Sequence, residues 1–165
     1  MRKNSLLFFF VSIFFLGICG TANAVAVLTL AEKEIAAIKT FTQDGVAYIN
    51  KYGTKNAYAE INKVNGKLRK GSYYLFVYNY DGQCLAHGDD PGQYVGTNLF
   101  KAKDTNGALF MNGMVKLAKS GGGFVQYTWP NAKTGKEELK TSYIMPAGNN
   151  TLVGAGISNS RELPQ

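Results

Sequence analysis

The chain has 165 residues, a length typical of a single domain. Hydrophobic residues make up 45% of it and charged residues 18%, which excludes a chain that is disordered throughout. The formal net charge is +7, but the basic residues form no clustered run, so we predict no nucleic-acid partner.

The start of the chain has the pattern of an export signal. A basic beginning is followed by an apolar run over residues 6–19 and by the small residues Ala22 and Ala24 of an A-x-A cleavage site. The run is shorter than the roughly 20 residues that a membrane-spanning helix needs. We therefore expect residues 1–24 to be a cleaved signal peptide and residues 25–165 to be the mature domain, in the periplasm or secreted. An uncleaved membrane anchor is the alternative.

Cleavage would change the charge and the cysteine content. The number of lysine and arginine residues falls from 18 to 16, and the number of acidic residues stays at 11, so the net charge of the mature chain is +5. Cys84 is then the one cysteine in the mature chain, so no internal disulfide can form. The mature domain must therefore be stabilised by its core alone.

Two helices are predicted next. Thr29 and Glu32 have the spacing of a capping box, and apolar side chains follow at steps of three and four up to Ile49. We expect an amphipathic helix of about 20 residues that ends at Gly53. A second, short helix is expected over residues 57–64.

The pattern changes to period two after Lys70. Residues 72–80 are rich in β-forming side chains, and an Asp-Gly turn joins them to residues 83–87, which predicts a hairpin. The next segments are a loop over residues 89–92, a helix around Met111 that ends at Gly121, and strands over residues 124–129, 138–145 and 152–157. We therefore expect an α+β domain with a long helix on a five-stranded antiparallel sheet.

The reactive residue types do not form a catalytic set. His87 is the one histidine, and Asp89 and Asp90 follow it too closely to suggest a metal site. Cys84 lies three residues before His87 on one predicted strand, so the thiol and the imidazole should point to opposite faces. Nucleotide-binding fingerprints are absent. We predict no enzyme activity, no metal and no cofactor.

The second half of the chain is arranged like a binding pocket. Tyr127 and Trp129 share strand parity, as do Lys140 and Ser142 on the next strand, with Tyr143 on the other face unless the strand bulges. An ammonium beside phenolic hydroxyls and an indole suits a small carboxylate. In the alternative, the aromatic residues belong to the core and Lys140 extends to solvent.

From about Ala31 to Ser158 the chain resembles the single Cache domain family, which occurs alone or in bacterial chemoreceptors and sensor kinases. The resemblance rests on short blocks that follow one another in register. These blocks are residues 45–49, 59–66, 74–82, 85–87, 96–99, 104–107, 121–130, 140–143 and 154–157.

The resemblance implies a PAS-like extracytoplasmic fold whose pocket binds a small organic acid or an amino acid. At matched positions Lys140 would bind the carboxylate, and Tyr127, Trp129 and Tyr143 would form walls and donors. The remaining candidates are His87 and Asn98 at the rim, Phe76 and Tyr78 at the floor or wall, and Met111 and Met114 on the inserted helix. A core role stays open for Phe76, Tyr78 and both methionines, and a loop-fixing role for Asn98.

We therefore predict a soluble, exported, sensor-type domain that binds a small ligand and either scavenges it or presents it to a membrane receptor. The alternative is an interaction or structural partner of a membrane chemoreceptor or sensor kinase. Such a partner would have a degenerate pocket and would dock through the long helix.

Overall fold

The structure is a computed structural model that describes residues 21–131 and 134–158. Residues 1–20, which are most of the predicted signal peptide, lie outside the described residues. No helix in the described part of the chain is both long and apolar enough to cross a membrane.

Helix α1 spans Thr21–Ile61 and is broken at Gly53, where φ is 75° and ψ is 159°. This backbone conformation is essentially restricted to glycine, so the predicted break at Gly53 is confirmed. The predicted start at Thr29 is wrong, because the helix already runs through this segment. Residues 21–28 contain no glycine or proline, so nothing in the sequence stops the helix from extending beyond the capping-box motif.

The sheet has six antiparallel strands. Their order is β1-β2-β6-β5-β4, and β3 pairs with β2. The strands are β1 (Arg69–Lys70), β2 (Tyr73–Asn79), β3 (Cys84–His87), β4 (Gly123–Pro130), β5 (Glu137–Pro146) and β6 (Thr151–Ser158). The expected α+β class is confirmed, and the sixth strand is the two-residue β1, too short to give a period-two pattern.

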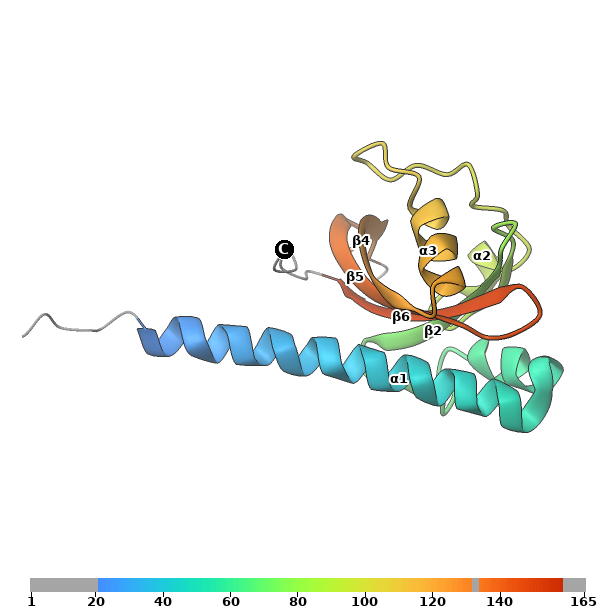
Figure 1. The fold of residues 1–165 in the computed structure, drawn as a ribbon, viewed down its shortest axis with the longest axis horizontal. Helices are drawn as coiled ribbons and strands as arrows, with labels where there is room; N and C mark the ends of the chain where they lie inside the picture. Colours follow the sequence, from blue (N-terminus) through green and yellow to red (C-terminus); the bar gives the residue numbers. More distant parts are fainter. Residues whose placement is uncertain (1–20, 132–133, 159–165) are drawn as a thin grey trace, which may run out of the picture.

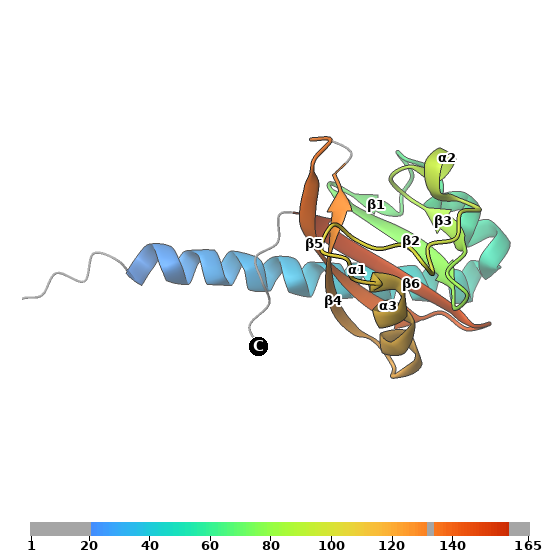
Figure 2. The ribbon, with the colours of Figure 1, turned by 90° about the horizontal axis from the view of Figure 1, so that it is seen from above.

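Two further helices follow β3. The predicted loop after His87 contains the short helix α2 (Pro91–Tyr94), whose first turn is capped by the Asp90 carboxylate, which accepts from the Gln93 N–H. Helix α3 (Phe110–Lys119) ends before Gly121, which has a φ of 97°. Figures 1 and 2 show α1 along one face of the sheet and α3 across the other.

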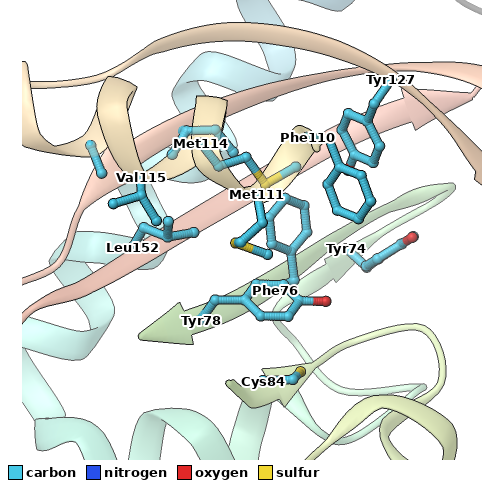
Figure 3. Close-up of a cluster of buried hydrophobic side chains, with 12 residues drawn as sticks. Tyr74, Phe76, Tyr78, Cys84, Phe110, Met111, Met114, Val115, Tyr127 and Leu152 are labelled. Atoms are coloured by element: carbon cyan, nitrogen blue, oxygen red, sulfur yellow. The ribbon is translucent and has the colours of Figure 1, made fainter. Parts of the chain in front are cut away.

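The sheet separates two apolar cores. Leu75 and Val77 of β2 point toward α1 and pack with Ile49. Tyr74, Phe76 and Tyr78 alternate with them and point toward α3, where they pack with its methionines (Figure 3). Strand β2 is therefore buried on both faces, and its candidate pocket residues Phe76 and Tyr78 belong to the core between the sheet and α3.

Candidate functional site

A lysine lies inside the core between the sheet and α3. Lys140 of β5 is 1% exposed, and its Nζ donates a hydrogen bond to the Tyr74 hydroxyl. The Nζ atom also lies 4.2 Å from the ring centroid of Tyr74, 5.4 Å from that of Phe76 and 5.8 Å from that of Trp129. The alternative in which Lys140 extends to solvent is therefore wrong.

No salt bridge to Lys140 is found among the described residues. Burial lowers the pKa of Lys140 to about 7, and the more distant charge of Asp89 opposes this shift. A buried cation is costly unless an anion pairs with it. At neutral pH Lys140 is therefore only partly protonated, and a small anion beside it would stabilise the charged form.

His87 of β3 supplies a second polar group and is 2% exposed. Its Nδ1 accepts a hydrogen bond from the Asp90 N–H at 3.1 Å, so in the neutral ring the proton is on Nε2. Burial, with the charges of Lys140 and Arg69, lowers the pKa of His87 to about 3. At neutral pH His87 is thus an uncharged ring with a donor at Nε2.

Aromatic side chains of β4 and α3 close the site. Tyr127 stacks on Phe110 with ring centroids 5.0 Å apart, and its hydroxyl lies 3.1 Å from the Ser142 hydroxyl. The Trp129 ring lies 6.0 Å from Tyr127, on the same face of β4 as predicted. Burial raises the pKa of Tyr127, so its hydroxyl stays protonated and able to donate.

These side chains surround a cavity of about 10 Å³, which has room for about one water molecule. The lining residues are Phe76, Tyr78, His87, Phe110, Met114, Tyr127, Trp129 and Lys140. Most of the residues proposed from the sequence are therefore brought together here. A ligand with several heavy atoms requires the walls to move apart.

Three predicted site residues do not line this cavity. Met111 is fully buried in the same core. Tyr143 lies on the opposite face of β5, because the pairing of β5 is regular, and its ring contacts Lys39 of α1. The Asn98 side chain donates to the Asp81 carbonyl and accepts from the Phe100 N–H, both at 2.9 Å, and so fixes a surface loop.

A larger groove lies on the outer side of Tyr74. It has a volume of about 210 Å³, and Tyr74, Arg69 and Asp89 are among its lining residues. Arg69 pairs with Asp89 at 3.0 Å and donates to the Gly88 carbonyl at 2.9 Å. Tyr74 therefore contacts Lys140 and also borders the outer groove. It was missed as a site residue, although its parity with Phe76 would have placed it on the correct face.

The arrangement does not activate the Cys84 thiol. Burial raises the pKa of the Cys84 thiol to about 11, so the thiol is protonated at neutral pH. The described residues contain no group of three or more histidine, cysteine, aspartate or glutamate side chains that could hold a metal ion.

Comparison with known proteins agrees with this fold. Residues 31–158 match the family Single Cache domain 2. The chain belongs to this family. The single Cache domain is 32% identical over 85 residues to the sensor histidine kinase MctS of Rhizobium johnstonii, a match that covers 51% of this chain and 18% of the kinase.

Two solved structures have the same fold. A methyl-accepting chemotaxis protein from Vibrio parahaemolyticus has a TM-score of 0.67 and 19% identity, over 82% of this chain and 95% of that one. A Cache chemosensory domain, described as a basis for carboxylic acid recognition, has a TM-score of 0.57 and 24% identity, over 84% and 95% of the two chains. The present chain is therefore a single Cache domain by its family match, and it has the fold of these two structures.

Proposed function

We propose that this single Cache domain is an exported sensor module that binds a small organic acid through Lys140. The observation that supports the proposal is the buried Lys140 ammonium, which has no carboxylate partner among the described residues. A ligand carboxylate would supply the missing charge and accept hydrogen bonds from Lys140 and from His87 Nε2. The surrounding rings would exclude water and strengthen this attraction.

The cavity of about 10 Å³ beside Lys140, called the inner cavity from here on, has a lining that favours an organic acid over an amino acid. Lys140, His87 and the tyrosines can donate hydrogen bonds, and no aspartate or glutamate is among the lining residues. The ammonium of an amino acid would lie near Lys140 without a carboxylate to pair with it. The ligand class that fits is a short acid whose remaining groups are apolar or accept hydrogen bonds.

We further propose that residues 1–24 direct export and that the mature domain acts by binding rather than by catalysis, in the periplasm or outside the cell. A membrane receptor would receive the ligand-bound form. A second candidate is a partner of a membrane chemoreceptor or sensor kinase with a degenerate pocket. The small volume of the cavity, about 10 Å³, favours this candidate.

Thermal unfolding with acetate, propionate, lactate and pyruvate tests the proposal, with glycine and alanine for comparison. An acid at 100 times its Kd adds about 2.7 kcal/mol of stability, or roughly 10 °C in Tm for a domain of this size. Lys140→Met should abolish the shift, and Lys116→Met, at an exposed position on α3, should retain it. If no acid shifts the Tm of the wild type, the degenerate-pocket candidate replaces this proposal.

A further inference from the structure

The Tyr74 hydroxyl occupies the place at Lys140 that a carboxylate would take. Lys140 Nζ donates to this hydroxyl, and Tyr74 is buried on β2, on the same face as Phe76. A neutral hydroxyl is a weaker acceptor for an ammonium than a carboxylate. The contact therefore satisfies one donor of Lys140 without neutralising its charge.

The space around Lys140 does not allow both acceptors at once. The inner cavity of about 10 Å³ has room for about one water molecule, and a carboxylate oxygen would have to approach Nζ to about 2.8 Å. The outer groove of about 210 Å³ borders Tyr74 on its other side. Arg69 lies against the Tyr74 ring, 5.9 Å from the centroid, and is tethered there by Asp89. The structure thus offers Tyr74 a direction in which to move.

We propose that the Tyr74 hydroxyl is an internal competitor of the ligand. In the ligand-free domain it accepts the hydrogen bond of Lys140, and an incoming carboxylate replaces it while the Tyr74 side chain turns toward the outer groove. This inference rests on the proposed function, since it concerns the same anion at Lys140. It makes Tyr74 a residue that sets affinity by stabilising the closed, ligand-free state.

The sign of one mutational effect tests the proposal. Tyr74→Phe keeps the ring and removes the hydroxyl, so the ligand-free state loses the Lys140 hydrogen bond and the ligand-bound state loses nothing. At a pH below the Lys140 pKa of both proteins, where the side chain is an ammonium in each, acetate and pyruvate should therefore bind at least about tenfold more tightly to Tyr74→Phe than to the wild type. If the hydroxyl instead stays in place and donates to the carboxylate, the same change weakens binding.

Tyr73→Phe is the matched control, because Tyr73 is the neighbouring residue of β2 and contacts Phe41 on the α1 side of the sheet. Isothermal titration of the three proteins with acetate and with pyruvate gives the affinities, and Tyr73→Phe should equal the wild type. If the wild type binds and Tyr74→Phe binds equally or more weakly, the competitor proposal is overturned and the proposed function stands. If neither the wild type nor Tyr74→Phe binds either acid, both are overturned.

A measurement on the ligand-free protein is independent of the choice of acid. The Tyr74 hydroxyl stabilises the charged form of Lys140 by accepting from it, so its removal should lower the pKa of Lys140 further. A titration of the Lys140 side chain by ¹³Cε chemical shift measures this pKa in the wild type, Tyr74→Phe and Tyr73→Phe. An unchanged pKa in Tyr74→Phe would show that the hydroxyl does not hold the ammonium and would overturn the proposal.

Discussion

Replacement of Lys140 by methionine is expected to stabilise the protein while it removes anion binding. Burial lowers the pKa of Lys140 from 10.5 to about 7. Below pH 7 this shift means that the folded state disfavours the ammonium by about 5 kcal/mol. Methionine is similar in length, uncharged and adaptable in packing, so it can lie among the same rings without that cost. Lys140→Met should therefore raise the free energy of unfolding at pH 6 by up to about 5 kcal/mol.

The gain depends on pH with a defined sign. Between pH 7 and the unfolded pKa of 10.5, the unfolded chain binds more protons at Lys140 than the folded chain does, so the stability of the wild type rises with pH. The advantage of methionine should fall to about 1 kcal/mol at pH 9.5. Urea unfolding of both proteins without added ligand, at pH 6 and pH 9.5, measures the difference.

Lys116→Met, at an exposed position on α3, is the control, and its stability relative to the wild type should not change between these pH values. Two results would refute the reasoning. One is a loss of several kcal/mol in Lys140→Met at pH 6, and the other is an advantage of the same size at both pH values. Either result would mean that the Lys140 ammonium is not a costly buried charge.

Three other perturbations have defined outcomes. A Cβ at Gly154 would lie 2.7 Å from an Ile144 methyl and would overlap the Phe76 ring. Gly154→Ala should therefore lower the free energy of unfolding by about 1–3 kcal/mol, measured by urea unfolding. In the control Gly92→Ala, the added Cβ meets no atom closer than 3.7 Å, so the loss should be less than about 1 kcal/mol. Asp89→Asn removes the Arg69 ion pair and should lower stability by about 1 kcal/mol; an equal effect at 1 M salt would contradict an ionic origin. Acetate affinity should fall about tenfold per pH unit above pH 7, because the pKa of Lys140 is about 7 and only the ammonium binds the anion. Calorimetric titration at pH 6, 8 and 9 measures the affinity, and equal affinities at these pH values would contradict the prediction.

The sequence was sufficient for those parts of the fold that depend on local pattern. The break at Gly53 followed from the residue type, because only glycine readily adopts the backbone conformation found there. The hairpin of β2 and β3 followed from its Asp-Gly turn. The start of α1 did not follow, because a capping-box motif can also lie inside a longer helix. The two-residue β1 is defined by its pairing with Tyr73 and Tyr74 rather than by its own sequence.

The candidate site could be predicted as a set of residues but not as a shape. Strand parity paired Tyr127 with Trp129 and Lys140 with Ser142, and it put Tyr143 on the other face, where the structure has it. Tyr143 was included as a site residue only through the family resemblance. The volume of the cavity depends on how rings from β2, β4 and α3 pack against one another, which no periodic pattern encodes. For the same reason the contact between Lys140 and Tyr74 became visible only in three dimensions.

Strand β6 is buried from Thr151 to Ile157 without alternation, because α1 covers one face of the sheet and α3 the other. Leu152 packs on the α3 side and Val153 on the α1 side, and small residues such as Gly154 and Ala155 follow them. In a saturation mutagenesis scan, most substitutions at every position of β6 from Thr151 to Ile157 should therefore destabilise the protein. Strand β4, which is only partly buried along most of its length, would tolerate changes at more of its positions.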